Sequence, residues 1–356
     1  HEGDVMPAYY GETANSCRLE ECLLKASDMI GWKEKGMRTV MPDGKIRARG
    51  VAMAMQGSSI SNCDVGSVTV KLSDEGTYHI TVGCTDMGTG CDTIIAQFAA
   101  DVLETPIDNI SVYGVDTDIS PYDSGSYASS TTYLTGMAAV KACEQLRERI
   151  IALAAVRMNK DASALTFDGE NVIDESDGAK MSLFDIATAS MCNNEISLEV
   201  TYSHSSPVSP PPFMAACAEI EADPETGAIE LLDYTACVDC GTVVNTNLAR
   251  VQTEGGLLQG IGMTLYEDIW YDERGKNLSN SFMQYKVPSR LDTDRIRVEF
   301  DSSYEPTGPF GAKSIGEIVI NTPAPAIADA VYNATGVWIN ELPITPEKIL
   351  KGMKVI

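Results

Sequence analysis

The sequence predicts an α+β protein with two lobes, built from mixed sheets with packed helices. Three observations support this prediction. Strand and helix patterns alternate over residues 78–158, and two apolar strands follow each other over 216–238. A proline-rich stretch at 206–212 lies between the alternating region and the two strands. That stretch is typical of a linker. The predicted parts are a lead-in segment with a short helix at 1–42, a first lobe at 43–205 and a second lobe at 206–356.

Hydrophobic periodicity predicts the elements of the first part of the chain. A helix is expected around 19–30, and apolar strand patterns follow at 46–55, 67–72 and 78–84, the last two joined by a hairpin turn at 74–76. The elements expected after these are a helix carrying Ile94, Ile95, Phe98, Ala99 and Val102, a strand at 109–113, a long helix ending near Met158, a strand at 164–167 and a helix at 182–192.

The second lobe opens with strands at 216–222 and 229–238, joined by a turn at 223–227. A helix over about 247–267 contains four glycines, each of which costs about 1 kcal/mol relative to alanine. Either another backbone or a ligand must therefore approach this helix closely. The last expected elements are a strand at 296–300, a helix at 323–333 with Thr322 as its cap and Pro323 in its first turn, and a helix at 346–351.

Composition excludes several classes of partner. The 356 residues include 26 Lys and Arg against 51 Asp and Glu, a net charge of −25 that argues against nucleic acid and anionic membranes. The ten cysteines have irregular spacing, which indicates reduced thiols in a cytoplasmic protein, and the single Cys-x-x-Cys at 237–240 has no second pair to complete a zinc site. With three histidines and no apolar run of transmembrane length, neither a His-ligated metal nor a membrane span is expected.

Three loops place small or hydroxylated residues at predicted helix N-termini, which bind anions through unpaired N–H groups. They are Gly88-Thr89-Gly90, the stretch 126–132 with five Ser or Thr among seven residues, and 245–247 before the glycine-containing helix. Taken singly, each is more often a simple cap and turn, and no Walker or dinucleotide-binding motif is present. These loops become candidates for a cofactor site only in combination.

The loop at 311–317 ends in the candidate catalytic residue, Glu317. Its two glycines, alanine and serine let the backbone pass close to a large group. The apolar residues around Glu317 are expected to strip water from its carboxylate, which raises the pKa of a carboxyl group and suits a general base near neutral pH. The alternative is that Glu317 is one of many surface acids.

Taken in order, these stretches resemble the C-terminal half of the molybdopterin-binding subunit of the xanthine dehydrogenase and aldehyde oxidoreductase family. The resemblance covers nearly the whole chain and is carried by five pieces: 87–90, 116–130, 245–262, 311–317 and 342–348. It implies that Glu317 is the catalytic base beside a molybdenum held by the dithiolene of a pterin, so that no protein side chain ligates the metal. It also implies the cytosine dinucleotide form of molybdopterin.

The resemblance further implies site residues and partners. Ser58 is placed in the substrate pocket, and iron–sulfur clusters and FAD are placed on partner subunits, together with an absent N-terminal half of the molybdenum subunit. The first loop departs from the family because it has Thr89 where glutamine is usual. The implied cofactor contacts are Gly88, Thr89, Gly90, Ala128, Ser129, Ser130, Gln252 and Gly316.

The expected function is hydroxylation of an electron-poor carbon, in an N-heterocycle such as xanthine or in an aldehyde, with oxygen derived from water. The chain is expected to be inactive without its missing half and partner subunits. Two alternatives stay open: the carbon monoxide dehydrogenase branch of the same superfamily, and a non-catalytic module that binds molybdopterin. Substrate identity and the choice between a sulfido and a selenido ligand are also open.

Overall fold

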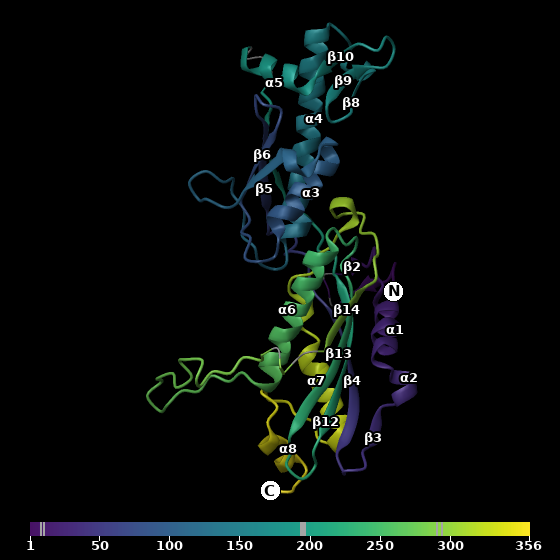
Figure 1. Cartoon of the computed structure of the whole chain (residues 1–356), viewed down its shortest axis with the longest axis vertical. Helices are drawn as coiled ribbons and strands as arrows, with labels where there is room; N and C mark the ends of the chain where they lie inside the picture. Colours follow the sequence, from purple (N-terminus) through teal and green to yellow (C-terminus); the bar gives the residue numbers. More distant parts are fainter. Residues whose placement is uncertain (8, 10, 193–196, 290, 293–294) are drawn as a thin grey trace. The chain divides into compact units, whose positions relative to one another are not determined.

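The computed structural model describes residues 1–7, 9, 11–192, 197–289, 291–292 and 295–356. It confirms the predicted α+β class, with helices packed on mixed sheets (Figure 1). The chain forms two compact units. The first unit contains residues 1–56, 211–305 and 315–356, and the second contains 57–210 and 306–314.

A five-stranded sheet forms the centre of the first unit. Its strand order is β14-β13-β12-β4-β3, and every pairing is antiparallel except that of β13 with β14. Strand β4 pairs along its whole length with β12, so that Ile46 lies opposite Ala222 and Met55 opposite Phe213. The strands are β3 (Arg38–Val40), β4 (Ile46–Met55), β12 (Phe213–Ala222), β13 (Ile229–Asp239) and β14 (Ile296–Phe300).

Helices cover both faces of this sheet, because successive side chains of a strand point to opposite faces. On one face, Ala215 and Cys217 of β12 pack against helix α1 (Leu19–Ile30). On the other, Ala216 and Ala218 pack in a core with helices α6 (Thr246–Leu265) and α7 (Pro323–Thr335). Strand β12 is therefore almost entirely buried. The remaining elements are β1 (Val5–Met6), β2 (Glu12–Thr13), α2 (Trp32–Lys35), the 3-10 turn η5 (Ile318–Ile320) and α8 (Pro346–Gly352).

The second unit is built on a four-stranded sheet with the order β11-β5-β6-β7. The hairpin predicted between β5 and β6 is present, and helix α3 (Cys91–Leu103) connects β6 to the parallel strand β7. Helix α4 (Gly136–Met158) packs on β5 and β11 and is preceded by one π-helical turn, η2 (Thr131–Thr135). The strands are β5 (Gly66–Leu72), β6 (Tyr78–Val82), β7 (Ile110–Tyr113) and β11 (Glu199–His204).

A smaller three-stranded sheet with the order β10-β9-β8 completes the second unit. Strand β11 and the strands β9 and β10 of this sheet had no counterpart among the predicted elements. The remaining elements of the unit are η1 (Ile107–Asn109), η3 (Ala162–Ala164), β8 (Leu165–Phe167), β9 (Asn171–Asp174), β10 (Lys180–Ser182), α5 (Leu183–Cys192) and η4 (Pro309–Gly311).

The compact units begin and end at other residues than the predicted lobes. Strand β4 lies in the predicted first lobe, but it pairs with β12, which lies in the predicted second lobe, and both strands belong to the first compact unit. The division at residues 43 and 206 stays a prediction about domains. The proline-rich stretch lies at a boundary between the units, but it is not an exposed linker. Ser206 and Ser209 are buried there, and the Ser209 hydroxyl donates to the Ser59 carbonyl at 2.6 Å.

Two further expectations can be compared with the structure. Nine cysteines are described as free thiols and seven of these are buried, as predicted for reduced thiols. The side chain of the tenth, Cys192, lies outside the described residues. Across the part of the chain that the structure describes, no helix combines the length and apolar character needed to cross a membrane.

Candidate functional site

The residues that the sequence predicts for the site fall into two groups. The first compact unit holds Gln252, Gly316 and Glu317, and the second holds the other seven. That all ten serve one site stays a prediction. The seven residues of the second unit are Ser58, Gly88, Thr89, Gly90, Ala128, Ser129 and Ser130.

The loop before α3 is organised by Asp86. Its Oδ1 atom accepts hydrogen bonds from the backbone N–H groups of Gly88 at 2.9 Å and Gly90 at 3.1 Å. Both glycines have positive φ, 101° and 75°, which glycine adopts without strain. A Cβ atom at Gly88 would meet no atom within 4 Å, so the loop borders open space. A bound group can approach this backbone, although the N–H groups of Gly88 and Gly90 already donate hydrogen bonds to Asp86.

The second loop, which leads into η2, contains two strained residues. Ala128 and Ser129 have φ values of 49° and 55°, in the left-handed region that costs a non-glycine residue roughly 1–2 kcal/mol. The Ser126 hydroxyl ties this loop to the first, because it accepts from the Thr85 N–H at 2.8 Å and donates to the Thr85 carbonyl at 3.0 Å. Backbone strain held in this way is characteristic of functional loops.

The second loop is also anchored to the beginning of β5. The Tyr127 hydroxyl donates to the carboxylate of Asp64, and this bond raises the pKa of Tyr127. The Ser124 hydroxyl accepts from the N–H of Val65 at 2.9 Å and donates to its carbonyl at 3.1 Å. Both anchors lie directly before the strained residues Ala128 and Ser129 in the chain, so the loop is fixed where the strained backbone begins.

Negative charge gathers beside the first loop. Asp86, Cys91 and Asp92 bring possible metal-ligand atoms within 4.8 Å of one another, although acidic groups of this kind are common without a metal. Burial, and then the charge of Asp86, raise the pKa of Asp92. No Lys or Arg occurs at 85–92 or 124–132.

The two loops suit a group that is recognised through hydrogen bonds. They combine hydroxyl groups and strained, half-buried backbone with open space at Gly88, and they contain no Lys or Arg. The carboxylates beside the first loop would repel a bare anion. The residues present therefore fit an uncharged pterin ring system, with its amide and amine groups, better than they fit a phosphate.

Ser58, predicted to line a substrate pocket, is fully buried. Its hydroxyl donates to the Pro210 carbonyl at 2.6 Å, and its Oγ accepts from the N–H of Ser314 at 3.1 Å. Ser58 thus fixes the chain at Ser314, three residues before Glu317. A contact between Ser58 and a substrate stays a prediction.

Glu317 is exposed in this structure, whereas the sequence analysis expected a carboxylate stripped of water by its apolar neighbours. The reason is that Ile318 and Val319 turn into the core between α6 and α7 and leave the carboxylate outside it. Gln56, which directly follows β4, donates from Nε2 to Glu317 Oε2 at 3.4 Å and accepts from the Asn321 amide at 3.5 Å. Sequence reasoning missed Gln56, although its position between a strand and Gly57-Ser58 was visible.

The glycines of α6 receive the segment that follows Glu317. A Cβ atom at Gly256 would lie 2.2 Å from Val319 Cγ2, and one at Gly260 would lie 2.6 Å from Pro323 Cγ. The sequence predicted that either a ligand or another part of the chain approaches this helix closely. At Gly256 and Gly260, the close neighbour is another part of the chain. Gln252 is half-buried on the same helix, one turn before Gly256.

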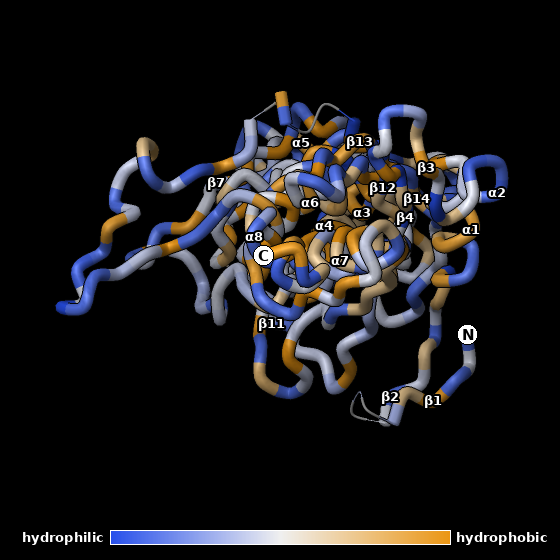
Figure 2. Tube along the Cα trace, turned by 90° about the horizontal axis from the view of Figure 1, so that it is seen from below, coloured by the Kyte–Doolittle hydropathy of each residue, from blue (hydrophilic) through white to orange (hydrophobic). Residues whose placement is uncertain are grey.

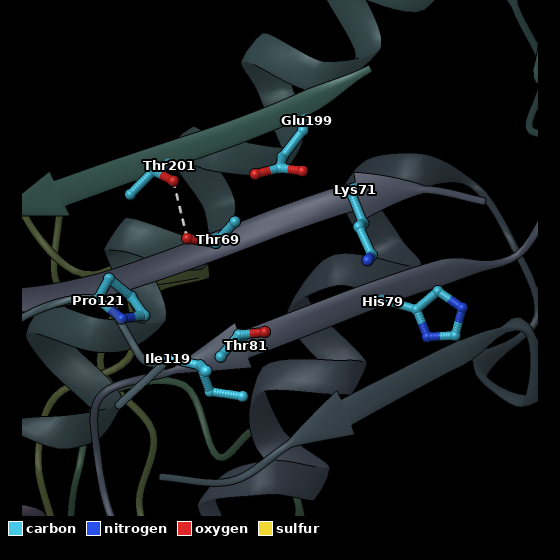
Figure 3. Close-up of a pocket in the computed structure, with 8 residues that line it drawn as sticks. All are labelled: Thr69, Lys71, His79, Thr81, Ile119, Pro121, Glu199 and Thr201. Carbon is cyan, nitrogen blue, oxygen red and sulfur yellow. Dashed lines mark hydrogen bonds between the residues drawn. The ribbon is translucent and has the colours of Figure 1, made fainter. Parts of the chain in front are cut away.

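A pocket of about 420 Å³ lies elsewhere, on the face of the four-stranded sheet that α3 and α4 do not cover (Figure 3). Thr69 and Thr201 share a hydrogen bond of 2.8 Å across this face, and Lys71, His79 and Glu199 surround them. Polar side chains are expected on the solvated face of such a sheet. Its lining includes none of the predicted site residues.

Comparison with known proteins gives a family match. Residues 25–294 match the family model described as the molybdopterin cofactor-binding domain. The chain is 38% identical over 346 residues to the probable hypoxanthine oxidase of Escherichia coli (strain K12), with 97% of this chain and 36% of that protein covered. It is 30% identical over 358 residues to the xanthine dehydrogenase molybdenum-binding subunit of Escherichia coli O157:H7, with 98% and 47% covered.

A solved structure shares the fold. The quinoline 2-oxidoreductase of Pseudomonas putida 86 superposes with a TM-score of 0.87 at 25% sequence identity. The similarity covers 98% of this chain and 48% of that one. The chain therefore spans between about a third and a half of the relatives that it matches.

Proposed function

Because the chain belongs to the family of molybdopterin cofactor-binding domains, with molybdenum-binding subunits of xanthine dehydrogenase and aldehyde oxidoreductase type among its relatives, we propose that it is the catalytic C-terminal part of a molybdenum hydroxylase. The reaction places a hydroxyl group, with oxygen derived from water, on an electron-poor carbon. The substrate is an N-heterocycle of purine-like character or an aldehyde. The names of the relatives support both substrate classes.

The observation that carries this proposal is the pair of joined loops in the second compact unit. Strained backbone at Ala128 and Ser129, tied through Ser126 to the loop before α3, offers hydrogen-bonding groups without a cation. When bound, the molybdenum cofactor, proposed as the cytosine dinucleotide form, supplies the centre that takes up two electrons from the substrate. The residues proposed to hold it are Gly88, Thr89, Gly90, Ala128, Ser129, Ser130, Gln252 and Gly316.

Glu317 is the proposed general base. Its carboxylate takes up the proton that is released as water-derived oxygen bonds to the substrate carbon, a task for which a carboxylate is suited. Gln56 orients this carboxylate through its hydrogen bond to Oε2. Ser58 contributes to the substrate pocket in this proposal, through the loop that it holds.

The chain spans about a third to a half of the length of its relatives, and the proposed partners supply what the enzyme needs beyond it. The remaining part of the molybdenum subunit, an iron–sulfur protein and an FAD protein complete the enzyme, because the electrons must leave the cofactor through further redox centres. Free, mostly buried cysteines support a reducing compartment, and we place the protein in the cytoplasm.

The test is to purify the complex from native cells through a tag on this chain and to measure molybdenum, released nucleotide, iron and flavin. We expect stoichiometric molybdenum, a cytosine nucleotide and co-purifying redox proteins, with turnover lost after growth on tungstate. A stable monomer without molybdenum would contradict the proposal. Bound molybdenum without turnover of any N-heterocycle or aldehyde would favour the non-catalytic module.

A further inference from the structure

An extended arm, residues 267–289, projects from the first compact unit between α6 and β14 (Figure 1). Within the described residues 265–292, no side chain is buried. Figure 2 shows hydrophobic stretches alternating with hydrophilic ones along the arm. Among the described residues, its one pairing of strand type is an isolated bridge between Tyr271 and Asn277.

The arm exposes an unusual set of large apolar side chains, with exposed fractions from 47% at Leu278 to 81% at Met283. Burying one such side chain is worth roughly 1.5–3 kcal/mol, so covering several of them in an interface would contribute substantially to the free energy of binding. Aromatic residues and methionine are also the types enriched at protein interfaces. The set is Ile269, Trp270, Tyr271, Leu278, Phe282, Met283 and Val287.

Hydrogen bonds nevertheless give the tip of the arm a defined turn. Asp272 closes its tip, accepting at Oδ1 from the N–H groups of Arg274 and Lys276, each at 2.9 Å. The Leu278 N–H donates to the Trp270 carbonyl at 2.7 Å, so the two sides of the tip are joined. A turn that is already closed by hydrogen bonds loses less conformational entropy on binding than an open one.

Charge and length indicate which partner the arm fits. The arm has four acidic and three basic residues, so it carries −1 of a total charge of −25. A second copy of the chain would bring another −25, which opposes self-association. The family model reaches residue 294 and so includes the arm, while more than half of each relative lies outside the region that this chain spans.

We propose that the arm is the surface through which this chain binds the remaining part of the molybdenum subunit, whose apolar groove receives Trp270 and Phe282. The inference rests on the proposed function for the identity of this partner. The exposed aromatic side chains are expected to dominate the affinity, because a few buried aromatic anchors carry most of the energy of typical interfaces.

The test uses the full chain and the polypeptide from the same organism that matches the portion of the relatives outside this chain. Their Kd is measured by biolayer interferometry for the wild type and for Trp270→Ser and Phe282→Ser. Each variant is expected to bind about 30-fold more weakly or worse, as for an interface hot spot. Val40→Ser, which changes an apolar residue of β3 with 59% exposure, is the matched control and should bind like the wild type.

Hydrogen exchange on the wild type gives a second readout that needs no variant: residues 267–289 should gain protection when the polypeptide is added. Unchanged affinity of both arm variants, unchanged exchange in the arm, or a wild-type dimer that the arm variants dissociate would each overturn the inference. Molybdenum content of the native complex is measured separately. A complex that needs the arm but lacks molybdenum would refute the proposed function and leave the arm's role standing.

Discussion

Replacing Gly256 with alanine tests whether α6 positions the segment after Glu317. The new methyl group would lie 2.2 Å from Val319 Cγ2, a distance at which one of the two must move. Val319 is fully buried on the short turn η5, so relief requires this turn to shift, and Glu317 is its N-terminal cap residue. Gly255, on the same helix, provides the control, since a Cβ there meets nothing within 4 Å.

The expected magnitudes follow from two opposing effects. Alanine in place of a helical glycine stabilises by about 1 kcal/mol at either position. Overpacking at Gly256 costs about 1–3 kcal/mol, so the free energy of unfolding of Gly256→Ala should lie about 1–3 kcal/mol below that of Gly255→Ala. Urea unfolding of the purified variants measures this difference.

A third variant separates crowding from other causes. Val319→Ala removes the crowded methyl group, so the double variant with Gly256→Ala should be more stable than the sum of the single effects predicts, by about 1 kcal/mol. Equal unfolding free energies for Gly255→Ala and Gly256→Ala, or strict additivity in the double variant, would refute the packing argument.

Three other variants test the loops, the base and the electrostatics. Ser129→Asp adds a negative charge to a loop without cations, and the purified complex should lose molybdenum while its circular dichroism stays unchanged; full metal content would mean that the loop is only a cap. Gln56→Leu removes the hydrogen bond to Glu317 and should slow turnover roughly threefold to tenfold at unchanged molybdenum content, and an unchanged rate would remove Gln56 from the site. Lys160 and Ser176 lower the pKa of Asp174 from 3.8 to about 2, so native stability should fall as pH falls through this window. Lys160→Gln should therefore be less stable at neutral pH and less pH-dependent between pH 2 and 4 in thermal unfolding, and a wild-type profile would contradict this.

Local periodicity predicted most helices and strands, but it could not predict their partners. The strand at 46–55 was expected from its apolar residues, whereas its pairing with β12 depends on contacts across more than 150 residues. The same limit applies to the stretch at 206–212, which lies at a boundary between the compact units but is largely buried. Prolines and serines at 206–212 are typical of exposed segments, yet here the serine hydroxyls bond to buried backbone.

The candidate site shows a similar division. The close approach that the glycines of α6 predicted is present at Gly256 and Gly260, where the neighbours are Val319 and Pro323, but not at Gly255. Thr322 is the N-cap residue of α7, as predicted, but its hydroxyl makes no capping hydrogen bond and instead accepts from Tyr234 at 3.0 Å. Nothing in the periodicity of residues 267–289 indicated an exposed arm, because its apolar residues follow neither a helical nor a strand repeat.

Glu317→Gln in the complete complex tests the central claim most directly. The amide keeps the size of the side chain but cannot take up a proton at neutral pH. We predict that molybdenum content stays at the wild-type level while turnover falls roughly 10²–10⁴-fold, the usual worth of general-base assistance. Both quantities are measured on the same sample, with Gln56→Leu as a variant that keeps the carboxylate. Full metal content with a near-normal rate would contradict the claim that Glu317 is the catalytic base.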